Sequence, residues 1–375
     1  MTSRFGPGAD HPPTDGPRAE ADDRDDPYDD ATLAALLGLD ALDEARPEGE
    51  PPADEELITI TDDAGGADDE PSRSGPRPSD RSQLPQPPLA GVVGAALARR
   101  AAGQPTGPWA AEPIGPVDAF RRTLDELALL VGRLDPGDWD APTPWASEGW
   151  QVRDMVAHLV GVERYTASLL GAGAFAVPDG LEADHLAVTG PTVAGLRDLL
   201  PAALAARWRA AVDTATSAVE AAAQRGRGLD QPMSFHLLPM RLRTFLVVRV
   251  FEVWTHTDDI RRAIGEAPQA PDGARLRLMS ETAVEALPLG MAIAGRAHPG
   301  RTARVVLTGA GGGAWSQSLN LGEPVGEPSA LIVADVVDFC RLAARRLDAG
   351  ELPCVIEGDA SLAADVLVGA AIFAA

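Results

Sequence analysis

Residues 241–264 read RLRTFLVVRVFEVWTHTDDIRRAI. Apolar side chains recur at helical spacing through this stretch, which predicts an amphipathic helix. Glu252 and His256 are four residues apart, so they lie one above the other and continue the stripe of Phe245 and Val248. That stripe is expected to face the protein core. The helix therefore carries a carboxylate and an imidazole into an apolar interior.

A second amphipathic helix is predicted over residues 151–170, and His158 lies on its apolar stripe. Buried carboxylates and imidazoles are costly unless they are paired or bind a metal. His158, Glu252 and His256 together form an open three-ligand set for zinc, with a fourth position for water, a thiol or substrate. Asp259 is placed to orient His256 by accepting a hydrogen bond. On spacing alone, a structural Glu–His hydrogen bond is the alternative interpretation.

Further helical patterns, with no convincing strand between them, predict a helical bundle over residues 108–300. They cover residues 117–134, 193–224 with a break at Pro201, and 276–294 with a kink or split at Pro288. The other histidines in this part, His185, His236 and His298, fall near loops or helix ends. They are expected to be surface or structural residues.

Residues 301–375 predict a small α+β domain. Strands are expected over 302–308, 315–321 and 354–357, and helices over 332–347 and 362–373. Residues 309–313 (GAGGG) read as a hairpin turn, because the Lys and Ser/Thr of a phosphate-binding loop are missing. The two cysteines, Cys340 and Cys354, have no histidine or metal-ligand pattern beside them and are expected to be packing residues.

The net charge of −24 is concentrated at the start of the chain. Residues 1–107 hold 23 acidic residues against 9 arginines, are rich in Pro and Gly, and are expected to be a largely disordered extension. Within it, residues 31–42 predict a short helix, transient or able to dock on a partner. The charge argues against nucleic-acid or anionic-membrane partners. No signal peptide or long apolar run is evident, so a cytoplasmic location is expected.

Two motifs resemble a known family. Residues 142–145 read PTPW, residues 149–159 read GWQVRDMVAHL, and residues 249–261 read RVFEVWTHTDDIR. Together they are similar to the signatures of the mycothiol-dependent maleylpyruvate isomerase family, a branch of the DinB-like four-helix metalloproteins. The resemblance covers residues 117–375 and implies a DinB-like bundle followed by a sterol-carrier-like domain. It also implies that His158, Glu252 and His256 bind a divalent metal, usually Zn²⁺.

The same resemblance implies mycothiol as thiol cofactor or co-substrate and a small electrophile as substrate. In an isomerase the thiolate adds to the cis double bond of maleylpyruvate, and rotation and elimination give fumarylpyruvate; in an S-transferase the thiol stays on the electrophile. Family members often carry a Gly-Arg pair whose arginine meets the substrate carboxylate. Arg345 is the nearest match, with Ala344 in place of the glycine. The competing hypothesis is a non-catalytic metal- or thiol-binding regulator whose acidic residues 1–107 engage a protein partner.

Overall fold

A computed structural model of the chain describes residues 112–373, except residues 145–148, 178–179, 181–183 and 237. The predicted disordered extension over residues 1–107 and its short helix at 31–42 lie outside the described residues. None of the helices that are described is long and apolar enough to cross a membrane.

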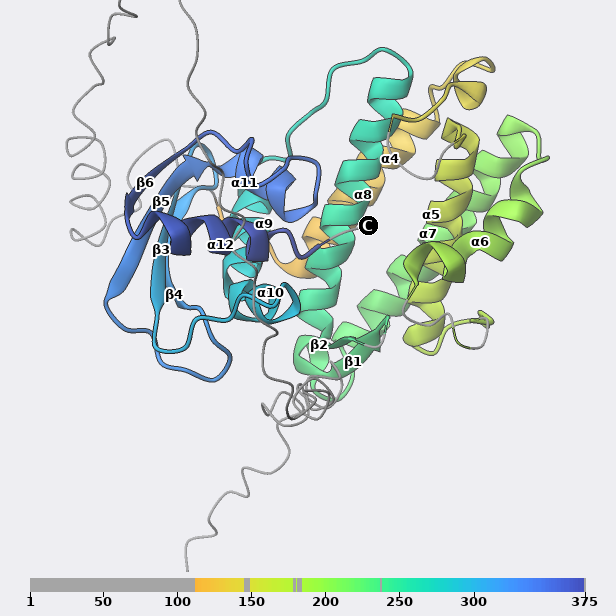
Figure 1. Ribbon diagram of the computed structural model, residues 1–375. Helices are drawn as coiled ribbons and strands as arrows, with labels where there is room; N and C mark the ends of the chain where they lie inside the picture. The colour runs from red at the N-terminus through yellow and green to blue at the C-terminus, as the bar shows by residue number, and fades with distance from the viewer. Residues whose placement is uncertain (1–111, 145–148, 178–179, 181–183, 237, 374–375) are drawn as a thin grey trace, which may run out of the picture.

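Helices dominate the first part of the described chain (Figure 1). The bundle contains α4 (Pro116–Val131), α5 (Val152–Leu169), α6 (His185–Leu196), α7 (Pro201–Ala223) and α8 (Leu242–Ala263). Two packed pairs, α4 with α8 and α5 with α7, make most of its contacts, and α6 covers α5. The predicted break at Pro201 is confirmed, because α6 ends at Leu196 and Pro201 begins α7.

Local chemistry sets where the functional helices begin. The side chain of Gln151 and the N3 residue Asp154 cap α5 reciprocally, which satisfies backbone N–H groups at its first turn. The carboxylate of Asp184 accepts a hydrogen bond from the Ala187 N–H and caps α6. Both caps fix the first turns of the helices that carry His158 and His185.

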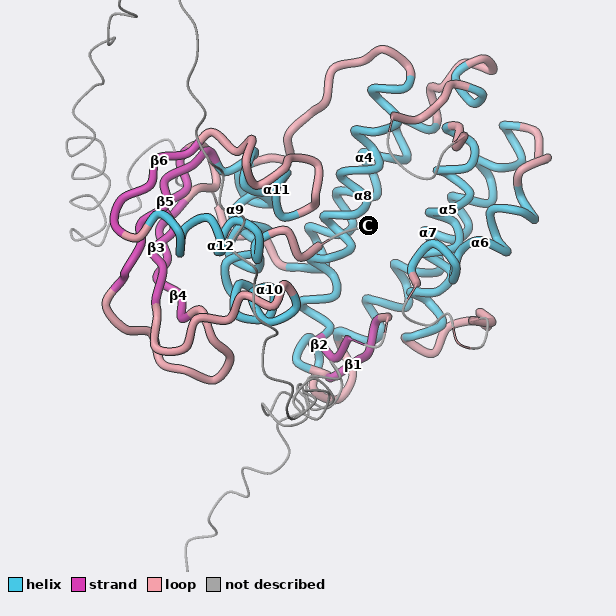
Figure 2. Tube along the Cα trace, viewed as in Figure 1, coloured by secondary structure: helices cyan, strands magenta, loops and turns pink. Residues whose placement is uncertain are grey.

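One expectation about the bundle is wrong. A short antiparallel hairpin, β1 (Pro232–Phe235) and β2 (Leu238–Arg241), connects α7 to α8 where no strand was expected (Figure 2). Each strand is only four residues long, so its alternation is too short to stand out from the flanking loops. The hairpin places the turn at His236 beside the bundle.

Two helices follow the bundle. They are α9 (Gly273–Glu285) and α10 (Leu287–Ile293), and Pro288 lies in the first turn of α10, so the predicted split is confirmed. Both helices pack against elements of the C-terminal part: α9 against α11 and β4, and α10 against α12 and β4. In Figure 1 they lie between α8 and the C-terminal sheet.

The C-terminal part is α+β, as predicted. It consists of β3 (Thr302–Thr308), β4 (Gly313–Ser318), β5 (Pro328–Asp335), α11 (Val336–Ala343), β6 (Cys354–Gly358) and α12 (Ala360–Ala370). The strands form one sheet in the order β4-β3-β5-β6, in which β3 and β5 are parallel and the outer pairs antiparallel. The glycine-rich residues 309–313 connect β3 to β4 as the predicted hairpin turn.

The helix predicted over residues 332–347 is wrong in its first part. Residues 328–335 form β5, and α11 begins only at Val336, after the N-cap residue Asp335. Ile332 of β5 pairs with Val305 of β3 and Ile356 of β6. A short apolar run is compatible with a helix or a buried strand, and here pairing on both sides selects the strand.

Candidate metal centre

Three side chains from two neighbouring helices face one another inside the bundle. His158 comes from α5, and Glu252 and His256 come from α8. One ligand atom from each of them lies within 4.8 Å of the other two. The side chains are almost fully buried, with exposed fractions of 0% for His158 and 3% for Glu252 and His256. The structure thus brings together the set that the helical stripes predicted.

Each of the two imidazoles is held by its Nδ1 atom. The Thr189 hydroxyl donates to backbone carbonyls one turn back on α6, so its oxygen accepts from Nδ1 of His158 at 2.8 Å. Nδ1 of His256 lies 3.3 Å from the Asp259 carboxylate, which can only accept when ionised. The predicted role of Asp259 as the group that orients His256 is confirmed. Both rings are therefore the tautomer whose Nε2 carries a lone pair.

Both Nε2 atoms are buried, and neither has a hydrogen-bond partner among the described residues. Burial, followed by the charges of His185 and His256, holds the pKa of His158 well below its usual value. Burial also lowers the pKa of His256 to about 4, although the bond to Asp259 opposes that shift. Both imidazoles are thus neutral at pH 7. Unprotonated nitrogens aimed at a shared point are the donors that a divalent metal requires.

The Glu252 carboxylate is held at both oxygens. Oε2 accepts a hydrogen bond from Arg249, and Oε1 accepts one from Nε2 of His185 at 2.8 Å. Arg249 also donates to Glu163 at 2.5 Å, and neither of these two side chains is exposed at all. Burial raises the pKa of Glu163, and the charge and hydrogen bond of Arg249 oppose that rise.

The charges of this buried group suit a cation. Glu163, Glu252 and Asp259 supply three carboxylates, whereas Arg249 and Arg346 supply two guanidinium groups. These ionised groups leave a net charge of −1 beside two neutral imidazoles. A divalent cation would therefore enter a negatively charged group and not a positively charged one. With the two lone pairs and the available Glu252 oxygen, the residues fit a metal of the zinc type.

Two histidines at this site were missed by the sequence analysis. His185 and His236 were expected to be surface or structural, but His185 contacts Glu252 and its Nδ1 lies 2.8 Å from Nε2 of His236. His185 is the first residue of α6, and His236 lies in the turn between β1 and β2. Neither continues a helical stripe, so no periodic signal marks them. His298 lies elsewhere and bonds Asp365 at 2.9 Å.

Arg345 is not brought to this cluster. Its side chain is exposed and its Nε donates to the carbonyl of Ala371, beside a surface pocket between α10 and α12. The next residue, Arg346, instead donates to Asp259 at 2.9 Å with only 4% of its side chain exposed. Arg345 has a φ of +51°, a conformation that favours glycine. A glycine at position 345 would adopt this φ without strain.

The first testable consequence concerns these two arginines. We expect Arg346→Met to lower zinc affinity by roughly 10- to 100-fold, because Asp259 loses the cation that holds it against His256. Arg345→Gly is the matched control, which relieves the positive φ and should keep the affinity of the unchanged chain. Competition with a chromophoric chelator measures both. A loss confined to Arg345→Gly would contradict this assignment.

The cysteines do not offer a protein nucleophile. Cys340 is buried and Cys354 is half-buried, and burial raises the pKa of both thiols. A raised pKa keeps a thiol protonated and unreactive at neutral pH. Sulfur chemistry at this site would therefore need a thiol from outside the chain.

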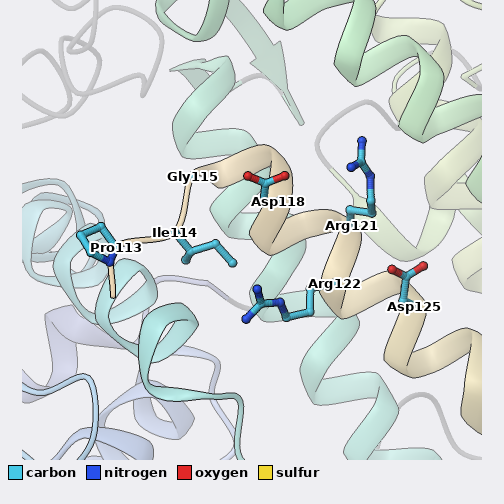
Figure 3. A pocket seen from close by; sticks show the side chains of 7 residues that line it. All are labelled: Pro113, Ile114, Gly115, Asp118, Arg121, Arg122 and Asp125. Atoms are coloured by element: carbon cyan, nitrogen blue, oxygen red, sulfur yellow. The ribbon is translucent and has the colours of Figure 1, made fainter. Parts of the chain in front are cut away.

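Another pocket of the described part is separate from the metal centre. It lies at the beginning of α4 and is lined by Pro113, Ile114, Gly115, Asp118, Arg121, Arg122 and Asp125 (Figure 3). Two of its arginines already form ion pairs, Arg121 with Glu220 and Arg122 with Asp272. None of the residues that hold the buried histidines lines it.

The fold and the site together define a class of protein. It is a helical bundle in which two helices present two histidines and a glutamate to one another. Residues 120–261 match the family described as "Mycothiol maleylpyruvate isomerase N-terminal domain". This segment contains His158, Glu252 and His256, and it belongs to that domain family. The resemblance seen in the sequence motifs is therefore confirmed over residues 120–261.

Two solved structures are also similar. One is the crystal structure of the mycothiol-dependent maleylpyruvate isomerase, at 14% identity and a TM-score of 0.43, covering 62% of this chain and 88% of that one. The other is a histidine-to-alanine mutant of that isomerase, at 12% identity and a TM-score of 0.43, covering 64% and 91%. Among curated proteins, no relative matched this chain.

Proposed function

We propose that this protein is a metal-dependent enzyme that uses mycothiol, either to isomerise a maleylpyruvate-like substrate or to transfer the thiol to a small electrophile. The observation that carries the proposal is the pair of buried Nε2 atoms beside Glu252 that have no hydrogen-bond partner among the described residues. His158, Glu252 and His256 would hold a divalent metal, with Zn²⁺ as the proposed ion. When bound, such a metal supplies Lewis acidity that stabilises a thiolate at neutral pH.

The chain's own residues have definable tasks around this centre. Thr189 and Asp259 fix the ring orientation of the two histidines, and Arg249 fixes the carboxylate of Glu252. Only one of the three ligand groups is anionic, so the centre would keep a positive charge toward an incoming thiol. Arg346, rather than Arg345, is our choice for the arginine that serves a substrate carboxylate, because it alone of the two reaches the buried group.

The test is turnover of maleylpyruvate and a panel of electrophiles by the purified full chain. We expect product only when mycothiol and metal are both present, and none from Glu252→Ala. Mycothiol consumption separates the two reactions, because an isomerase regenerates the thiol and a transferase uses one thiol for each electrophile. Turnover with mycothiol that survives Glu252→Ala or His256→Ala would rule out this function.

A further inference from the structure

The interactions of Glu252 extend beyond the three proposed metal ligands. Its Oε1 accepts from Nε2 of His185 at 2.8 Å, and Nδ1 of His185 lies 2.8 Å from Nε2 of His236. The three residues come from α8, from the first turn of α6 and from the β1–β2 turn. We propose that His185 and His236 are positioning residues, which hold Glu252 so that it offers one oxygen to the metal. This inference rests on the proposed function.

The direction of each hydrogen bond follows from its acceptor. An ionised carboxylate only accepts, so Nε2 of His185 carries the proton that it donates to Glu252. Nδ1 of a neutral His185 then has a lone pair, and it accepts from the Nε2–H of His236. The chain of bonds thus runs in one direction, from the turn to the carboxylate. Removing His236 takes away the group that fixes the tautomer and ring orientation of His185.

These bonds restrict how Glu252 can bind a metal. Arg249 takes Oε2, and His185 takes one lone pair of Oε1. The same Oε1 lies 3.4 Å from Nε2 of His158, so its remaining lone pair is on the side of the proposed ligands. Oε1 is therefore the oxygen that Glu252 would offer to the metal. His185 itself lies outside the group of three whose ligand atoms are mutually close.

The β1–β2 turn determines how the His236 side chain is placed. The φ of His236 is +51°, a conformation that favours glycine, and a two-residue hairpin turn such as the one between Phe235 and Leu238 requires it. Here the imidazole packs against Phe235, with ring centroids 4.0 Å apart, and against Tyr165 at 5.7 Å. The turn therefore places the His236 ring against Phe235 and Tyr165, within hydrogen-bond distance of His185.

His236→Gly separates the imidazole from the backbone strain. Glycine adopts the positive φ without cost, which offsets the lost contacts of the imidazole, so the metal-free fold should resist urea about as well as the unchanged chain. Zinc affinity should nevertheless fall by about 10- to 100-fold, as is typical when a group that orients a metal ligand is lost. His185→Phe should give a similar loss, and His298→Ala, which removes an imidazole outside the cluster, should give none.

The double variant His185→Phe with His236→Gly tests whether the two residues act in one chain. Its zinc affinity should equal that of His185→Phe alone, because His236 acts only through His185. If the losses of zinc affinity in the two single variants multiply in the double variant, the two residues act independently and the proposed series of hydrogen bonds is wrong. Unchanged zinc affinity in both single variants would also contradict it. A loss in His185→Phe as large as that in His158→Ala would make His185 a ligand and overturn a positioning role. If the unchanged chain binds no zinc, the proposed function itself fails.

Discussion

Replacing Arg249 with methionine is expected to destabilise the fold by about 3–5 kcal/mol. Arg249 is completely buried and is the shared partner of Glu163 and Glu252, which are also buried. Methionine keeps much of the volume but leaves two carboxylates in the interior without their cation. Urea unfolding of the metal-free protein at pH 7 measures the difference.

The pH dependence of this effect has a definite sign. Burial already raises the pKa of Glu163, and without Arg249 nothing opposes that rise. A carboxyl whose pKa is higher in the folded than in the unfolded state favours folding as the pH falls. The difference in the free energy of unfolding between Arg249→Met and the unchanged chain should therefore decrease as the pH falls from 7 toward the usual carboxyl pKa of about 4.3. A difference that increases on acidification would contradict the burial of both carboxylates.

Two further variants control for the change of side chain. Arg243 forms an exposed ion pair with Asp230, so Arg243→Met should change stability by no more than about 1 kcal/mol. The double variant Arg249→Met with Glu163→Gln removes one of the two buried carboxylates that have lost their guanidinium partner. It should therefore recover part of the lost stability. Equal effects of Arg249→Met and Arg243→Met would refute the buried ion-pair network.

The second large effect is expected for His158→Ala. The substitution removes one of two neutral nitrogens aimed at the metal position, so zinc affinity should fall by more than the roughly 10- to 100-fold typical of an orienting residue. Chelator competition measures the affinity, and urea unfolding of the metal-free protein shows whether the variant folds. His298→Ala is again the matched control. Zinc affinity unchanged by His158→Ala would exclude this histidine as a ligand.

Helical periodicity was sufficient to predict which three side chains meet, whereas the metal interpretation also depended on the family resemblance. His158, Glu252 and His256 lie on stripes of two long helices, and a stripe fixes which side chains share a face. Helical periodicity could not predict His185 and His236, because α6 and the β1–β2 hairpin meet Glu252 only through tertiary packing. The proposal of Arg346 over Arg345 depended on which side chain reaches Asp259, and sequence spacing does not encode that contact.

The C-terminal part shows the same limit. β3 was predicted with its observed bounds, since its apolar run is isolated by turn residues. Residues 332–335 of β5 were predicted as the start of the helix over 332–347, because their apolar run continues directly into the apolar positions of α11. Only the pairing of β5 with β3 and β6, which lie far away in the sequence, settles its conformation.

The most direct measurement of the central claim is the zinc content of the purified full chain after removal of loosely bound metal. We expect about one zinc per chain, held by His158, Glu252 and His256, and a clear loss of zinc in His158→Ala but not in His298→Ala. A chain that retains no stoichiometric metal, or that retains it equally in His158→Ala, would contradict the metal centre and the thiol chemistry proposed for it.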